Sequence, residues 1–342
     1  MSKHKPRSGS KAFYPRVRAK KQTPSFKTYP VITTEKAKPL NFFGYKSGMT
    51  HLIAKDDHAK TTTFGQNIVM NGTMIEVPPI KVFGIRAYKK TYQGLQTISE
   101  IWAEKKEKHL SRKIIGLKTR NKPKKEKKVE GTPKIKKTIS DLELIKNEIE
   151  SIRLLIHTQP YLTGIGKKKP EVAEIVLSGN VEQQLEFAKQ KLGNEIKIDE
   201  VFKDKQFVDV RAVTTGKGFQ GVVKRYGVKT FRPKSKKSRV VGSISPWHPK
   251  TVMWTVGRPG QMGYHVRTEY NKKIMLMSNS SAEFNPKAGL PNYGNMKNEM
   301  ILLAGSIPGP VKRLIAIREP IRPVHESKAK VSEISYISVR GS

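Results

Sequence analysis

The 342-residue sequence predicts a β-rich fold that is interrupted by a small α/β insertion and by a long basic loop. Short stretches rich in Val and Ile, broken by Gly and Pro, are typical of strands. Apolar residues at helical spacing are confined to residues 140–200. Residues 215–273 carry fourteen Lys or Arg and one acid, Glu269, which is too much like charge for a compact core.

The first strands are predicted in two stretches, NFFGYKSGMTHLIAKD from residue 41 and TMIEVPPIKVFGIRAY from residue 73. Between them, Asn71-Gly72 indicates a hairpin turn by local rule. A glycine bulge within one long strand is the alternative, because Gly in a strand interior often marks such a bulge.

The insertion begins with the capping-box spacing of Ser140 and Glu143, and apolar residues continue at helical intervals to Ile152. The stretches RLLIHTQ and EVAEIVLSG are typical of strands. Asn180 is a candidate N-cap for the helix VEQQLEFAKQKLG, which Gly193 would stop. Further strands are predicted in FVDVRAVTTGKGFQGVV and, around a Pro-Gly turn, in NEMILLAGSIPGPVKRLIAIREPI.

The composition excludes several function classes. The net charge of +39 indicates a polyanionic partner, and a hydrophobic fraction of 36% still permits a core. The absence of cysteine excludes disulfides, thiolate metal sites and cysteine nucleophiles, and is compatible with a reducing compartment. We find no bilayer-spanning run, signal-peptide pattern or long basic amphipathic helix, so no membrane partner is expected.

The basic loop has the residue types of a nucleic-acid interface. Arg and Lys neutralise phosphates, aromatic rings stack on unpaired bases, and Gly allows the backbone to come close. Residues 1–40 hold eleven basic residues and one acid, and are either a solvated arm or, as their aromatics favour, an extension that orders on a polyanion. Residues 104–137 are interpreted as a solvated linker or a tract that touches phosphates loosely.

Nothing in the sequence indicates catalysis. Gly216 to Gly221 match a dinucleotide fingerprint, but no acid follows before Glu269 to hold a ribose, so we interpret the motif as a strand end close to phosphate. The eight histidines lack metal-ligand spacing, and His157 is interpreted as structural. No small-molecule substrate is expected.

Two tryptophans receive different interpretations. Pro246 and Pro249 flank Trp247-His248, so Trp247 is predicted at a presented loop tip. Trp254 has the apolar neighbours VMWTV and is the better candidate for packing.

Several blocks occur in a familiar order: FFGYKSGMT, VPPIKVFGIRAY, IWAE, HTQ, GKGFQGVVKRYGV, SPWHPKTVMWTVGRPGQMGYHVRTEYNKKI and GSIPGPVKRLIAIRE. Between residues 40 and 320 the chain therefore resembles the universal large-subunit ribosomal protein L3 family in its archaeal and eukaryotic form. Its length and the lack of a long C-terminal extension resemble the archaeal members. Two positions depart from the family pattern: Ser235 stands where eukaryotic members carry a methylatable histidine, and Met262 stands where many members are basic.

The resemblance implies a six-stranded translation-protein-type β-barrel with an α/β insertion, a basic N-terminal arm and a central finger. It implies a structural, non-enzymatic constituent of the cytoplasmic ribosome that binds large-subunit rRNA directly and early in assembly, beside neighbouring large-subunit proteins. The tip motif Trp247, His248 and Pro249 would reach towards the peptidyl-transferase centre. No cofactor is implied, apart from rRNA-associated Mg²⁺ without a dedicated site. The alternatives are a general DNA or chromatin-binding protein and an RNA-modifying enzyme.

The expected division is 1–40 as the basic N-terminal extension, 41–103 as the first part of the β-barrel, 104–200 as the basic linker and inserted α/β subdomain, 201–214 and 274–342 as the remainder of the barrel and the tail, and 215–273 as the RNA-penetrating finger. The predicted rRNA-binding residues lie in the extension and the finger: Arg16, Arg18, Lys20, Lys21, Lys217, Lys224, Arg225, Lys229, Arg232, Lys234, Lys236, Lys237, Arg239, Trp247, His248, Pro249, Lys250, Arg258, Gln261, His265, Arg267, Lys272 and Lys273.

Overall fold

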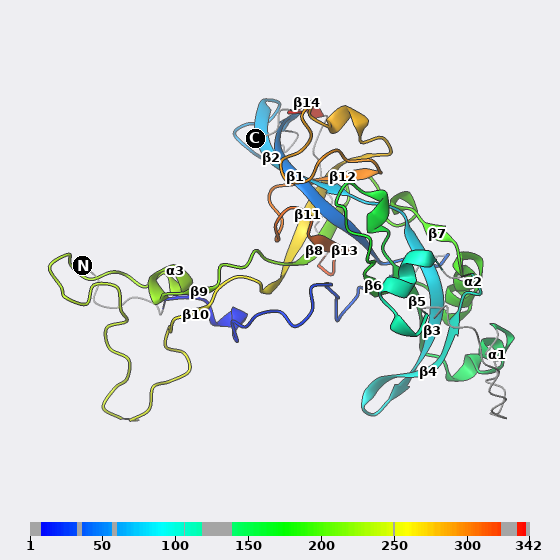
Figure 1. Cartoon of the computed structure of the whole chain (residues 1–342), viewed down its shortest axis with the longest axis horizontal. Helices are drawn as coiled ribbons and strands as arrows, with labels where there is room; N and C mark the ends of the chain where they lie inside the picture. Colours follow the sequence, from blue (N-terminus) through cyan, green and yellow to red (C-terminus); the bar gives the residue numbers. More distant parts are fainter. Residues whose placement is uncertain are drawn as a thin grey trace, which may run out of the picture. The chain divides into compact units, whose positions relative to one another are not determined.

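The chain folds into two compact units in a computed structural model (Figure 1). The structure describes residues 8–32, 36–56, 60–105, 107–117, 139–248, 250–322 and 334–339. We call Met1–Gln22 with Val213–Arg267 the basic unit, and Thr23–Ala212 with Thr268–Ser342 the sheet unit. Within the described residues, no helix has the length and apolar character needed to cross a membrane.

A seven-stranded sheet forms the first half of the sheet unit. Its strands are β1 (Asn41–Lys55), β2 (Asn67–Glu76), β8 (Phe207–Val213), β11 (Val266–Ser278), β12 (Met300–Ala304), β13 (Leu314–Arg318) and β14 (Ile334–Ile337). Their order is β13-β8-β11-β12-β2-β1-β14, and β1 also pairs with β13. The hydrogen bonds therefore close six of the strands into a ring, in the order β13-β8-β11-β12-β2-β1, and β14 lies outside this ring. Side chains on β12 and β13 are almost wholly buried, which explains why these strands read as continuous apolar runs.

A second sheet lies in the same unit. It contains β3 (Ile80–Thr91), β4 (Gly94–Trp102), β5 (Ser151–His157), β6 (Val172–Val176) and β7 (Glu195–Ile196). The order is β4-β3-β5-β6, with β7 paired to β3. Helix α2 (Val181–Lys191) packs on this sheet, since Leu185 and Ala188 are buried and the side chain of Gln184 accepts a 2.8 Å bond from the Ile152 amide.

The two sheets share one hydrophobic core. Phe42, Ile75 and Ile317 of the first sheet belong to the same buried cluster as Ile85 and Leu154 of the second. The remaining described elements of the sheet unit are short: α1 (Ile139–Leu144), η2 (Lys108–Arg112), η3 (Ile115–Leu117), η4 (Lys146–Glu148), η5 (Pro160–Leu162), η6 (Ile198–Glu200) and η7 (Ala282–Phe284).

The strand pairing corrects one predicted boundary. Residues 80–103 were expected with the first part of the barrel, but β3 and β4 belong to the second sheet. Pro78 and Pro79 separate β2 from β3, because proline cannot donate a ladder hydrogen bond. After this break, the chain pairs with β5 instead of continuing beside β1.

The hairpin prediction at Asn71-Gly72 is wrong, because both residues lie inside β2. Their partners on β1 are His51 and Thr50, in an unbroken antiparallel ladder, and the register shift of this pair lies at Lys46 instead. Glycine is needed here for packing: a Cβ on Gly72 would lie 2.9 Å from both Leu52 and Leu302.

The first predicted helix is much shorter than its periodicity suggests. The helix starts at Ile139, so Ser140 is not its N-cap, and Ile152 already belongs to β5. By contrast, Asn180 is the N-cap of α2 as predicted, where it forms a capping box with Gln183, and Gly193 follows the helix at φ +83°. The strands predicted around RLLIH and VAEIV are confirmed as β5 and β6. Between β12 and β13 the chain bends at Pro308-Gly309, but the hydrogen-bonded turn lies at Val311-Lys312, where the Arg313 amide donates to the Pro310 carbonyl oxygen at 3.2 Å.

His157 is buried on β5, and burial lowers its pKa. Its Nδ1 lies 3.3 Å from the carbonyl oxygen of Thr158, while its Nε2 has no hydrogen-bond partner within the described part of the chain. No cluster of three His, Asp or Glu side chains in that part has the arrangement of a metal site. His157 therefore has the surroundings of a core residue.

Gly44 in β1 provides a test of the close packing of the first sheet. A Cβ at Gly44 would lie 2.6 Å from Ile75, 2.7 Å from Val77 and 3.0 Å from the carbonyl oxygen of Glu76. We expect Gly44→Ala to lower the free energy of unfolding by about 1–3 kcal/mol, since an overpacked core must shift backbone. Gly116→Ala is the control, with open space around its Cβ. Equal thermal denaturation midpoints for the two variants would contradict this prediction.

Candidate nucleic-acid interface

The basic unit has a folded root built from four short elements. They are η1 (Lys11–Phe13), β9 (Phe219–Gln220), α3 (Val222–Tyr226) and β10 (Gly260–Gln261). Strands β9 and β10 pair antiparallel, and α3 is followed by the C-cap Gly227, whose φ of +68° suits glycine. The glycine motif from Gly216 to Gly221 thus spans β9 and leads into a helix of five residues.

Two of the predicted RNA-binding arginines hold this root together. The Arg225 guanidinium donates to the carbonyl oxygens of Gln261 at 3.0 Å, Arg258 at 2.7 Å and Arg16 at 3.1 Å. The Arg16 guanidinium donates to the carbonyl oxygen of Arg225 and lies 4.2 Å from the ring centroid of Tyr226. Arg225 therefore uses its donors within the protein, as do the two terminal nitrogens of Arg16, whereas the buried Arg16 Nε has no hydrogen-bond partner among the described residues.

Residues 8–22 pack along the same root. The ring of Tyr14 lies edge-on to that of Trp254 with centroids 5.4 Å apart, and Arg267 lies over Phe13 at 4.7 Å. His265 is buried and its Nδ1–H donates to the Val17 carbonyl oxygen at 2.8 Å. Burial raises the pKa of Tyr14. Burial, and to a smaller extent the positive charge of Arg16, lowers the pKa of Arg267. The arm is thus part of the unit's own packing.

The other predicted residues fall into two groups. Gln261 donates its side-chain amide to two neighbouring carbonyl oxygens, Lys272 pairs with Glu269 at 2.8 Å, and Lys273 is buried near Phe207. These three face the protein, and Pro249 lies outside the described residues. The exposed group is Arg18, Lys20, Lys21, Lys217, Lys224, Lys229, Arg232, Lys234, Lys236, Lys237, Arg239, Trp247, His248, Lys250 and Arg258.

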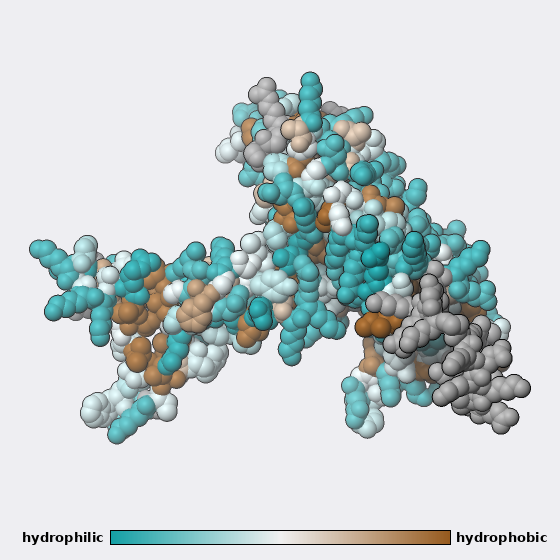
Figure 2. Space-filling model, in the orientation of Figure 1, coloured by the Kyte–Doolittle hydropathy of each residue, from teal (hydrophilic) through white to brown (hydrophobic). Residues whose placement is uncertain are grey.

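Trp247 and Trp254 are both exposed, at 82% and 69% of their surface. The loop-tip interpretation of Trp247 agrees with this, whereas the packing interpretation of Trp254 is wrong for most of its surface. Its apolar neighbours mislead because they lie in a loop, with a turn at Trp254-Thr255, and not in a core strand. Figure 2 has the orientation of Figure 1, in which α3, β9 and β10 are labelled. Around these elements, hydrophobic residues lie beside hydrophilic ones on the surface.

Sequence reasoning missed an apolar set in this loop. Ile244 and Met253 are 50% and 41% exposed, next to Val241 and Pro246. The sequence feature that indicates this apolar set is the uncharged run VVGSIS from residue 240, which separates two basic stretches.

Arg225→Lys tests the root. Lysine keeps the charge but loses the planar fork that reaches three carbonyl oxygens, and each bond to a charged group contributes about 1.5–3 kcal/mol. We expect faster amide hydrogen exchange at residues 222–227 and 258–264, by about tenfold or more. The matched control is Arg258→Lys at an exposed position, which should exchange at the wild-type rate. Unchanged exchange in Arg225→Lys would contradict the structural role.

Comparison with known proteins identifies the family of the chain. A family model described as Ribosomal protein L3 matches residues 1–340. The chain is 45% identical over 340 residues to the large ribosomal subunit protein uL3 of Methanocaldococcus jannaschii, covering 98% of this chain and 96% of that protein. It is 43% identical over 347 residues to uL3 of Archaeoglobus fulgidus, with 100% of both chains covered. It is 43% identical over 343 residues to uL3 of Methanobrevibacter smithii, with 98% and 97% covered. The chain therefore belongs to the ribosomal protein L3 family, in its archaeal form.

Proposed function

We propose that the protein is a structural constituent of the large ribosomal subunit in the cytoplasm, and not an enzyme. It binds large-subunit rRNA directly and early in assembly, and its basic unit reaches towards the peptidyl-transferase centre. The observation that carries this proposal is the exposed group of cations on a loop without acids between residues 215 and 268. Only a polyanion held along its length neutralises such a surface.

The fold supports this role. We infer that the ring of six strands is a β-barrel of the translation-protein type, and that the second sheet with α2 is its α/β insertion. In this proposal the barrel orients the N-terminal extension and the finger, which were predicted as residues 1–40 and 215–273. Neighbouring large-subunit proteins contact the remaining surface.

The interface divides its tasks among residue types. The exposed Lys and Arg neutralise phosphates, which supplies most of the affinity, and Trp247 stacks on an unpaired base. Arg16, Arg225 and His265 shape the root from within. Mg²⁺ enters only as part of the RNA's own ion atmosphere.

The test is chemical footprinting of the full chain on total cellular RNA. Protection of one junction of large-subunit rRNA is the expected result. Protection spread broadly over duplex regions would favour the general DNA or chromatin-binding alternative. Turnover of an RNA substrate by the chain would favour an RNA-modifying enzyme.

A further inference from the structure

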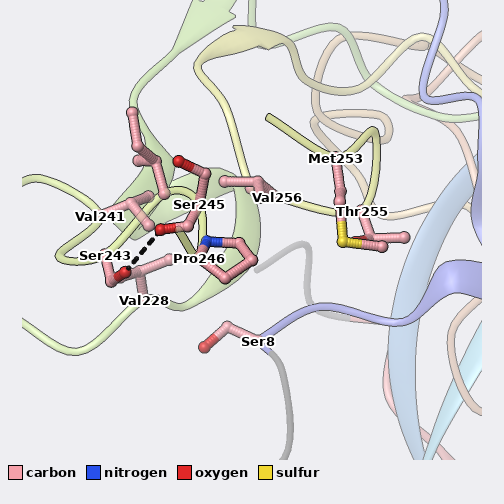
Figure 3. Close-up of a pocket in the computed structure, with 11 residues that line it drawn as sticks. Ser8, Val228, Val241, Ser243, Ser245, Pro246, Met253, Thr255 and Val256 are labelled. Atoms are coloured by element: carbon pink, nitrogen blue, oxygen red, sulfur yellow. Dashed lines mark hydrogen bonds between the residues drawn. The ribbon is translucent and has the colours of Figure 1, made fainter. Parts of the chain in front are cut away.

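The loop of the basic unit lines an open cavity of about 460 Å³, to which the arm contributes Ser8 and the loop contributes Val228 and residues from the stretches 241–246 and 253–257 (Figure 3). Val241, Pro246 and Met253 lie around the same space, which Ser8 borders from the arm. A cavity of this size is in the range of small-ligand sites, about 300–1,000 Å³.

The cavity wall is apolar with a few hydroxyl groups. Aliphatic side chains such as Val228, Val241 and Ile244 dominate it, and no residue that lines it carries a charge. Ser243, Ser245 and Thr255 add hydroxyls, and the Ser243 hydroxyl donates to the Ser245 carbonyl oxygen at 3.4 Å. Such a wall suits a flat group with apolar faces and a polar edge.

The charge around the cavity identifies the class of occupant. Residues 228–258 contain eight Lys or Arg and no acid. Lys229 directly follows the lining residue Val228, and Arg258 directly follows Gly257. The apolar wall and the surrounding cations together fit an apolar group that is attached to a polyanion. Such a group contacts the wall, while the phosphates of its chain remain outside the cavity near the cations.

We propose that this cavity binds a single unstacked nucleobase of the rRNA. The inference rests on the proposed function and adds a defined site to it, separate from the presented Trp247. Bases within a duplex are stacked and cannot enter, so the cavity selects a nucleotide in a loop, bulge or junction. Insertion of the base covers Ile244 and Met253, which are otherwise half exposed to water.

The decisive variant fills the cavity without changing charge. We compare the full wild-type chain with Ser243→Trp, using an unmodified transcript of large-subunit rRNA as the probe. The matched control is Ser235→Trp, because Ser235 is an exposed residue of the same loop that does not line the cavity. Two readouts are measured: the dissociation constant at several salt concentrations, and chemical probing of the Watson–Crick edges of unpaired bases.

In the wild type we expect one unpaired base to be protected. Ser243→Trp should expose that base and weaken binding by about tenfold, as for the loss of one stacked base. The slope of affinity against salt should stay unchanged, because no phosphate contact is lost. Ser235→Trp should match the wild type. If circular dichroism shows that Ser243→Trp is misfolded, Ile244→Ser replaces it and should also expose the base.

Three results would overturn the proposal or its basis. If Ser243→Trp bound rRNA with wild-type affinity and protected the same base, the base site would be contradicted and the proposed ribosomal function would stand. Crosslinking of residue 243 to a protein in assembled subunits, with unchanged base reactivity, would also remove it. Failure of the wild type to select large-subunit rRNA would instead remove the proposed function itself.

Discussion

Replacing Lys234, Lys236, Lys237 and Arg239 together with glutamine should weaken binding to large-subunit rRNA on the order of 100-fold at about 0.15 M salt. The four side chains are exposed in one stretch of the basic unit, so their loss should not disturb its buried root. Each lost phosphate contact should reduce the slope of log affinity against log salt by about 0.7 to 0.9. The total slope should therefore fall by about three.

The measurement is a titration of rRNA binding at several salt concentrations. The matched control replaces four exposed lysines of the sheet unit with glutamine: Lys168, Lys169, Lys203 and Lys287. Both variants have the same net charge. If affinity depended only on total charge, the two would lose equal affinity, and the localisation of the interface to the basic unit would be wrong.

The largest loss of stability is expected from Asp209→Ala in the sheet unit. Asp209 is fully buried and forms an ion pair with Arg318, whose side chain is 3% exposed. Asp209 also accepts hydrogen bonds from the amides of Asn271 at 3.1 Å and Ile321 at 3.2 Å. Its removal leaves the Arg318 guanidinium buried without a counter-charge, at a cost of about 3–5 kcal/mol.

Arg318 also connects the start of the sheet unit to this core. Its guanidinium donates to the Thr28 carbonyl oxygen and lies 4.4 Å from the ring centroid of Phe26. The loss in Asp209→Ala should therefore appear as a lower midpoint of denaturant unfolding and as faster exchange near residue 28.

A double variant separates the ion pair from its environment. Asp209→Ala with Arg318→Met removes both charges and should recover part of the stability, since an uncompensated buried charge is the main cost. The exposed pair of Lys89 and Glu148 is the control, and Glu148→Ala should leave the midpoint unchanged. A double variant less stable than Asp209→Ala would contradict this account of the buried pair.

Some features of the fold follow from local patterns and were predictable. The β5 and β6 strands and the N-cap at Asn180 depend on neighbouring residues alone. The interpretation of Trp247 as exposed also follows from its flanking prolines. Other features depend on distant residues. The position of Gly72 inside β2 depends on Leu52 and Leu302, which lie far away in the chain.

The candidate interface shows the same division. Its basic character is a property of composition, so the sequence by itself predicted a polyanionic partner and the stretch proposed to meet it. Only the tertiary structure decided which cations are free to meet it. Arg225 and Lys234 have the same charge, but Arg225 faces three carbonyl oxygens from other segments. The tertiary structure also decided that β3 pairs with β5 and that an uncharged run lines an open cavity. Hydrogen-bond partners and packing neighbours come from residues remote in the chain, and local residue patterns carry no record of them.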